Sequence, residues 1–220
     1  MPPIISNVPE YIHLHEHDLP NEIDIGPTVA IDTETMGLNP YRDRLCLVQL
    51  SSKNNEVHLV HFIPQQMGGK GYNACPNLRK LLTDRSITKI MHFARFDIGI
   101  LQYALKLRME NVICTKIAAK LTRTFTNKHG LASLCKDLLK IELNKQQQTS
   151  DWGAISLTAE QQIYAASDVL YLHNLWDCLK QLLIREQRLE LAEACFSFLP
   201  TRAELDMLGY DEVDIFSHQS

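Results

Sequence analysis

The first pair of acidic residues with a spacing that could bind a metal ion stands at the end of an apolar segment. Asp32 and Glu34 lie in the sequence TVAIDTE, and side chains two apart on a strand point to the same side. Two neighbouring carboxylates raise each other's pKa unless a cation lies between them. The pair is therefore a candidate metal site, although many surface strands end in such pairs.

Two further carboxylates stand in segments of helical pattern. Asp97 falls in the first turn of a helix expected from Arg95, where it could also be a cap favoured by the helix dipole. Tyr164 and Asp168 are four apart in YAASD, so they share one helix face. An Asp among Ala, Val and Leu is costly to bury without a partner, which favours a functional role for Asp168.

Together these residues are more specific than any one of them. Four carboxylates from three separate elements are what two divalent ions need, and Mg²⁺ and Mn²⁺ prefer carboxylate oxygens and water. Two such ions can stabilise the attacking and leaving oxygens of a phosphoryl displacement. A neighbouring Tyr hydroxyl could orient the attacking water. The pattern predicts metal-dependent cleavage of a phosphate ester.

The elements that must position these residues are mostly strands in the first third of the chain and mostly helices after it, with some alternation. Short segments rich in Val, Ile and Leu predict strands, and helical periodicity predicts the segments after them. Thr158 and Gln161 fit a capping box at the start of the strongest helix. We expect one α/β domain, 1–220, with a mixed central sheet of five or six strands flanked by helices. The expected strands are 28–33, 45–51, 56–62 and 87–92, and the expected helices are 76–83, 130–140 and 186–200, with others beginning at Arg95 and Thr158.

Composition excludes several classes of protein. The 220 residues carry 22 Lys and Arg against 26 Asp and Glu, a net charge of −4, which is unlike a basic nucleic-acid coat protein. Residues 70–145, however, hold an excess of basic side chains that could face an anionic ligand. No apolar run of membrane-spanning length and no secretory signal is present, and the six cysteines form no CxxC pair. We therefore expect a cytoplasmic protein with reduced thiols and no membrane partner.

Three motifs carry a resemblance to a known family. AIDTETMGL, HFARFDIGIL and SDWGAISLTAEQQIYAASDVLYL resemble the DEDD exonuclease superfamily, and within it the ribonuclease D group, over residues 24–183. The Tyr four residues before the last Asp matches the Tyr-type subclass; the His-type has His five residues before, where this chain has Ile163. The resemblance implies a ribonuclease-H-like fold and 3′→5′ release of nucleoside 5′-monophosphates with two Mg²⁺ or Mn²⁺ ions.

The resemblance also implies a role for each residue. Asp32, Glu34 and Asp168 would be direct metal ligands, with Asp32 bridging both ions. Asp97 would hold the second ion through water, and Tyr164 would position the nucleophilic water.

The layout departs from full-length ribonuclease D, in which helical RNA-binding domains follow the nuclease. Here a core of about 24–185 has an N-terminal arm or strand, 1–23, and is followed by a helix and acidic tail, 186–220, with no appended RNA-binding domain expected. This layout resembles the single-domain bacterial nanoRNase C type, which implies dinucleotide and other short single-stranded 5′-phosphorylated RNA substrates and a ring-like homo-oligomer. The alternatives are ribonuclease D-like 3′ trimming of tRNA or other structured RNA, a nuclease that also takes DNA, and a catalytically dead RNA-binding scaffold.

Substrate contacts are less well specified than the carboxylates. Leu38 matches the wedge leucine that separates two bases in oligoribonuclease-like enzymes, but it could be a plain hydrophobic contact at a turn. His92 opens the second motif and is a candidate contact. Lys128 belongs to a basic group before Gly130 that could bind phosphate or simply be solvated. That group comprises Lys116, Lys120, Arg123, Lys128 and His129.

Two other patterns have competing interpretations. His13, His15 and His17 alternate, so on a strand they could bind Zn²⁺ or Ni²⁺. We favour an exposed polar face, with Ile12 and Leu14 pointing inward. Trp152 could stack on a base, but we favour packing beneath the third motif.

Overall fold

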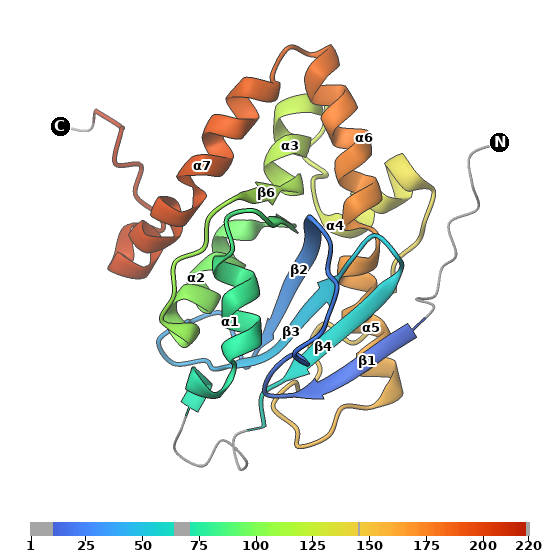
Figure 1. Ribbon diagram of the computed structural model, residues 1–220. Helices are drawn as coiled ribbons and strands as arrows, with labels where there is room; N and C mark the ends of the chain where they lie inside the picture. The colour runs from blue at the N-terminus through green and yellow to red at the C-terminus, as the bar shows by residue number, and fades with distance from the viewer. Residues whose placement is uncertain (1–10, 64–70, 145, 219–220) are drawn as a thin grey trace.

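A six-stranded mixed sheet lies at the centre of the computed structural model, which describes residues 11–63, 71–144 and 146–218 (Figure 1). The strand order is β1-β4-β3-β2-β5-β6. The β2–β3 and β3–β4 pairs are antiparallel, whereas the β1–β4, β2–β5 and β5–β6 pairs are parallel. The strands are β1 (Tyr11–Glu16), β2 (Thr28–Thr35), β3 (Leu45–Ser51), β4 (Glu56–His61), β5 (Thr88–Met91) and β6 (Val112–Cys114).

Helices cover both faces of the sheet (Figure 1). α1 and α2 lie on one face, and α5 and α6 on the other. Because both faces are covered, every side chain of the central strand β3 is buried. The α-helices are α1 (Pro76–Thr83), α2 (Ala94–Leu105), α3 (Thr115–Thr122), α4 (Leu131–Leu134), α5 (Ala159–Leu170), α6 (Leu172–Arg185) and α7 (Leu189–Leu205), and the short helical turns are η2 (Gly71–Ala74), η3 (Cys135–Leu139) and η4 (Asp206–Tyr210).

The predicted fold class is confirmed: the chain is a single α/β domain with a mixed sheet flanked by helices. Two elements differ from the expectation. The helix that begins after Thr158 is interrupted at Tyr171, whose backbone (φ −99°, ψ −3°) separates α5 from α6. β6 has only three residues, too few for a periodic pattern to reveal. Among the described residues, no helix is long and apolar enough to cross a lipid bilayer.

The capping box fixes the start of α5. The Gln161 backbone N–H donates to the Thr158 hydroxyl at 3.2 Å, and the Thr158 N–H donates to Oε1 of Gln161 at 2.8 Å. The buried Gln161 amide also donates to Ser150 Oγ at 2.7 Å. These bonds satisfy helix N–H groups that would otherwise lack partners and tie α5 to the preceding loop.

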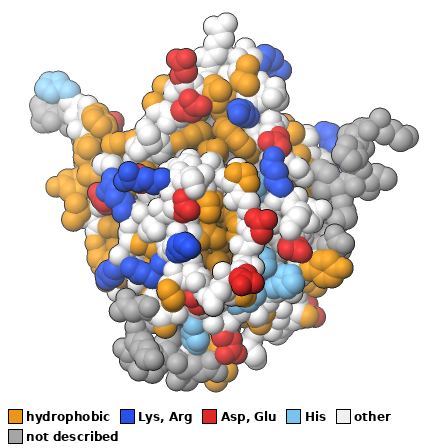
Figure 2. All heavy atoms as spheres, in the orientation of Figure 1, with side chains coloured by type: hydrophobic (Ala, Val, Ile, Leu, Met, Phe, Trp, Pro, Cys, Tyr) orange, Lys and Arg blue, Asp and Glu red, His pale blue; other side chains and the backbone are white. Residues whose placement is uncertain are grey.

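Imidazole rings gather where β1 joins the sheet, over the lower right of the face in Figure 2. His13 and His15 stack on His58 of β4, with ring centroids 4.9 and 5.3 Å apart, and His15 Nε2 lies 3.0 Å from His58 Nδ1. Among the described residues, the group of ligand atoms close enough to share a metal ion does not include these histidines. This arrangement agrees better with a polar strand face than with a metal site.

The expected inward residues of β1 behave differently from each other. Ile12 packs against the core, as predicted, but the expectation for Leu14 was wrong because its side chain is 42% exposed. β1 is an edge strand, so the helices that bury the sheet centre leave this position open. His17 lies beyond the end of β1 with a φ of 66°, so it does not continue the alternation.

The stacked histidines predict an acid-sensitive sheet edge. Burial, together with His13 and His15, lowers the pKa of His58 to about 4. Between that value and the ordinary pKa of about 6.5, the unfolded chain binds a proton that the folded chain excludes, so stability falls as pH decreases. The slope is at most about 1.4 kcal/mol per pH unit for one proton.

We expect His58→Asn to flatten the loss of thermal stability between pH 6.5 and 4, measured by circular dichroism. Above pH 7 His58 is neutral in both states, so this contribution is constant there. An acid profile of the variant that is as steep as that of the wild type would contradict the assignment.

Candidate active site

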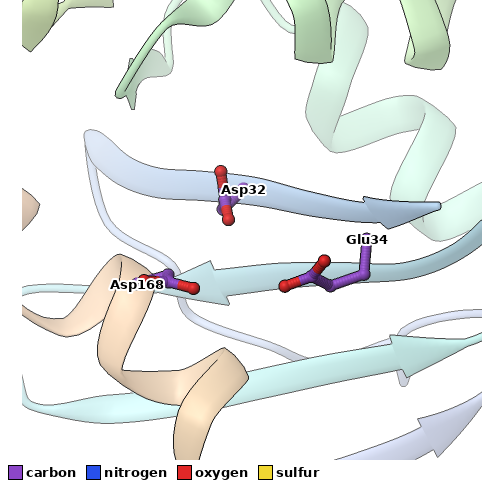
Figure 3. A group of neighbouring side chains, drawn as sticks. All are labelled: Asp32, Glu34 and Asp168. Carbon is purple, nitrogen blue, oxygen red and sulfur yellow. The ribbon is translucent and has the colours of Figure 1, made fainter. Parts of the chain in front are cut away.

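Three carboxylates converge at the end of β2 (Figure 3). Asp32 and Glu34 project from the same face of β2, and Asp168 reaches them from α5. One oxygen from each residue lies within 4.8 Å of the others. The structure thus joins two of the three predicted acidic segments into one cluster.

Asp97 approaches from the other face of the sheet. It lies in the first turn of α2, is buried, and accepts a hydrogen bond of 2.7 Å from the Thr33 hydroxyl. Thr33 stands between Asp32 and Glu34, and strand alternation turns its side chain away from theirs. Asp97 is outside the group of three, yet its charge raises the pKa of Asp32.

The cluster strongly disfavours ionisation in the absence of a cation. Burial raises the pKa of Glu34 to about 9 and those of Asp97 and Asp168 to about 7. The pKa of Asp32 is raised well above its usual range, by burial and then by the charges of Asp97, Asp168 and Glu34. The cause is loss of hydration combined with repulsion between like charges.

Among the described residues, the ion pairs of the chain use other acids and leave this cluster without a Lys or Arg partner. Partly buried acids that form no ion pair with Lys or Arg, with oxygens converging on one point, fit a divalent ion with oxygen ligands. The donor set is all carboxylate, which suits hard cations such as Mg²⁺ or Mn²⁺ better than soft ones.

Tyr164 lies one turn before Asp168 on α5 and packs beside Trp152, with ring centroids 6.0 Å apart. Burial and the surrounding carboxylates raise the pKa of Tyr164, so its hydroxyl stays protonated. The neighbouring Tyr164 hydroxyl opposes the rise in the pKa of Asp168. Trp152 is buried, which agrees with the packing role favoured from the sequence.

The loop before α5 is held by Arg44. Its guanidinium donates to the carbonyl oxygens of Gly153 at 2.9 Å and Phe62 at 3.1 Å. The backbone around Trp152 is thereby attached to the start of β3 and the end of β4. Since this loop leads into the capping box, Arg44 helps to place the helix that bears Asp168.

The three predicted substrate contacts lie in different surroundings. Leu38 is 82% exposed and lines an open cleft just beyond β2. His92 is half-buried, its Nδ1 lies 2.9 Å from Thr115 Oγ1, and burial lowers its pKa to about 4. Lys128 is exposed in the loop between α3 and α4 and does not line that cleft.

The other basic residues of this group lie in different surroundings from one another. Arg123 is buried and its guanidinium donates to Asp137, so it is not a free phosphate contact. Lys116 lies over the ring of Phe93, with Nζ 4.1 Å from the centroid. The expectation of one shared anion-binding group is therefore too simple.

Two residues near the carboxylates in the sequence or the structure were not predicted to belong to the site. Thr33 could have been placed opposite Asp32 by alternation, but its partner Asp97 depends on the strand order. Phe93 directly precedes α2, with a left-handed φ of 63° and an exposed ring that, like Leu38, lines the cleft. No pattern in the sequence signals that backbone, which is uncommon for a bulky residue and typical of functional sites.

Comparison with known proteins identifies the family of this chain. A 3′-5′ exonuclease family matches residues 15–184, which include all four carboxylates and Tyr164. The chain belongs to this family. Ribonuclease D of Gluconacetobacter diazotrophicus is 33% identical over 164 residues, a match that spans 74% of this chain and 40% of that protein.

Solved structures extend the likeness to nearly the whole chain. NrnC of Brucella melitensis bound to pGG is 51% identical with a TM-score of 0.87, over 94% of this chain and 98% of that one. The same nuclease with bound Mg²⁺ matches equally well, at 50% identity. Escherichia coli RNase D is 26% identical with a TM-score of 0.69, and the match covers 45% of its chain. The fold is that of ribonuclease-H-like exonuclease domains.

The cluster predicts that a single substitution will weaken metal binding. We expect Asp168→Asn to bind Mn²⁺ at least about tenfold more weakly than the wild type, about 1.4 kcal/mol, because an amide does not offset the charge of the ion. Isothermal titration calorimetry measures the affinity. Asp177→Asn is the matched control, since Asp177 is an exposed carboxylate on α6 that pairs with Lys53. Equal affinities in wild type and Asp168→Asn would refute the metal site.

Proposed function

We propose that this 3′-5′ exonuclease is an exoribonuclease that degrades very short 5′-phosphorylated RNA, including dinucleotides, to nucleoside 5′-monophosphates. The proposal is carried by the convergence of Asp32, Glu34 and Asp168 in a chain that matches, over 94% of its length, a nuclease whose solved structure holds pGG. Leu38, which is exposed and follows Glu34 by four residues, supports it, because an apolar side chain there can separate two bases.

The chemistry is assigned to this chain's own groups. Asp32, Glu34 and Asp168 would hold two divalent ions, Mg²⁺ or Mn²⁺, with Asp97 contributing through water from the opposite side. When bound, such ions supply charge stabilisation to both oxygens of an in-line phosphoryl displacement. The protonated Tyr164 hydroxyl orients the attacking water, and Thr33 holds the carboxylate of Asp97. Leu38 and His92 contact the terminal nucleosides, and Lys128 contacts the RNA backbone.

Two other functions remain as alternatives. Ribonuclease D-like trimming of tRNA or other structured RNA, or cleavage of DNA, is favoured by the relatives named ribonuclease D, although the chain spans 40% of the length of the first of them. A catalytically dead RNA-binding scaffold is disfavoured because all five catalytic positions hold the residues that the family motif requires.

We further propose that the chain assembles into a homo-oligomeric ring. Gel filtration tests this, because one chain has a mass of 25.2 kDa and a ring would elute at a multiple of it.

A substrate length series tests the proposed function. We expect turnover of 5′-phosphorylated RNA by the wild type to be highest for two nucleotides and to fall toward about ten, with monophosphate release measured by chromatography. DNA dinucleotides and a structured tRNA 3′ end are the comparison substrates. Turnover that rises with length would favour the ribonuclease D alternative.

The assigned roles predict a hierarchy among variants. Asp168→Asn should reduce kcat by several orders of magnitude, because carboxylates that share ions act as a unit. Tyr164→Phe should cost less, because it removes only an orienting hydroxyl. Initial rates on a dinucleotide at saturating Mn²⁺ measure both, with Asp177→Asn as the control. Near-normal turnover by Asp168→Asn would overturn the mechanism.

A further inference from the structure

A cleft of about 690 Å³ opens beyond the end of β2, and its walls come from three parts of the chain, two of which follow Glu34 and flank Asp97 in the sequence. The first wall is the segment after β2 that carries Leu38, the second is Phe93 and the first part of α2 as far as Gly99, and the third is the turn that follows α7. The volume is in the range of sites that enclose one drug-sized ligand, which is the size class of a single nucleotide. We call the third wall the end wall and define it as residues 206–211.

An ion network holds the end wall against α2. The Arg95 guanidinium makes two hydrogen bonds of 2.6 Å to the two carboxylate oxygens of Asp206, and the Asp206 side chain is only 18% exposed. Arg202 lies 3.1 Å from the same carboxylate and donates to the Asp211 carbonyl at 2.8 Å. Bidentate pairs of this kind fix geometry as well as contributing energy.

Close packing places the other part of the end wall. Met207 lies over Gly99 of α2, with Sδ 3.8 Å from the position that a Cβ of Gly99 would occupy. Gly209 adopts a φ of +90°, which bends the chain after Met207 at little steric cost to a glycine. The turn therefore has a defined shape, and Met207 lies over α2 two residues beyond Asp97.

The position of the end wall has a consequence for substrate length. Gly99, on which Met207 packs, follows Asp97 by two residues of α2, a rise of about 3 Å along the helix, so the end wall lies close to Asp97. The Arg95 guanidinium is engaged by Asp206 rather than directed to solvent as a free phosphate contact. At this end of the cleft an RNA would meet Met207 and the backbone of the turn, whereas the exposed Arg42 belongs to the first wall.

We propose that the end wall is the specificity-determining element that limits the length of RNA accepted at the site, and that Asp206 is the positioning residue that holds it there. This inference rests on the proposed function, since it names what makes that function selective for short RNA. The wall acts on access and not on the chemical step, so its loss should change the KM for longer RNA more than kcat.

Two independent variants test the end wall. Asp206→Ala releases the ion network, and Met207→Ala shortens the wall without changing charge. We expect both to raise the ratio of kcat/KM for a 5′-phosphorylated heptanucleotide to that for a dinucleotide by about fivefold or more, mainly through a lower KM for the heptanucleotide. The kcat for the dinucleotide should stay within about twofold of the wild type.

Glu204→Ala is the matched control, because Glu204 lies on α7 two residues before Asp206, pairs with Arg108 and does not line the cleft. It should keep the wild-type ratio. An unchanged ratio in both wall variants, or an equal fall on both RNAs, overturns the inference. If Asp206→Ala does not fold by circular dichroism, Met207→Ala decides alone.

The same measurements separate this inference from the proposed function. A wild type that prefers the heptanucleotide, or cleaves neither RNA, refutes the proposed function. A wild type that prefers the dinucleotide, with both wall variants keeping that preference, refutes the end wall alone.

Discussion

Carboxylates that approach within 4.8 Å of one another repel when they are ionised, and burial removes the water that would screen them. Asp32, Glu34 and Asp168 are held in this arrangement without a Lys or Arg partner among the described residues. A flexible chain would relieve the repulsion by moving apart. The arrangement therefore requires rigid elements on both sides, and much of the fold can be understood as meeting that requirement.

The rigidity comes from the middle of the sheet and from the anchoring of α5. β2 lies between β3 and β5: β3 pairs with the backbone at Asp32 and Glu34, and β5 holds the other edge at residues 28–30, just before the carboxylates. On the other side, the capping box and the contacts of Arg44 fix the approach of the helix that carries Asp168. A site that is unfavourable for folding is maintained by its surroundings, as is common where function requires crowded charge.

The sequence predicts those parts of the molecule that depend on local pattern. Alternation in TVAIDTE placed Asp32 and Glu34 on one face, and the spacing of Thr158 and Gln161 gave the capping box, which the structure contains in full. The features that the sequence does not predict are those that depend on the order of the strands in the sheet and on the backbone angles of single residues. The contact of Thr33 with Asp97 requires β2 and β5 to be neighbours, and the left-handed backbone of Phe93 has no sequence signature. Leu14 was misplaced because periodicity does not say which strand lies at an edge.

The place of β1 in the sheet bears on the order in which the chain can fold. β1 is the first strand in the sequence, yet its hydrogen-bonded neighbour is β4, and residues paired between them, such as Tyr11 and Glu56, are 45 positions apart. Its parallel pairing offers no local hairpin, so β1 joins the sheet only through a contact that is distant in the sequence. The loop-closure entropy of that contact has to be offset by the pairing itself. Among the described strands, the one that stands first in the sequence is thus expected to join the sheet late.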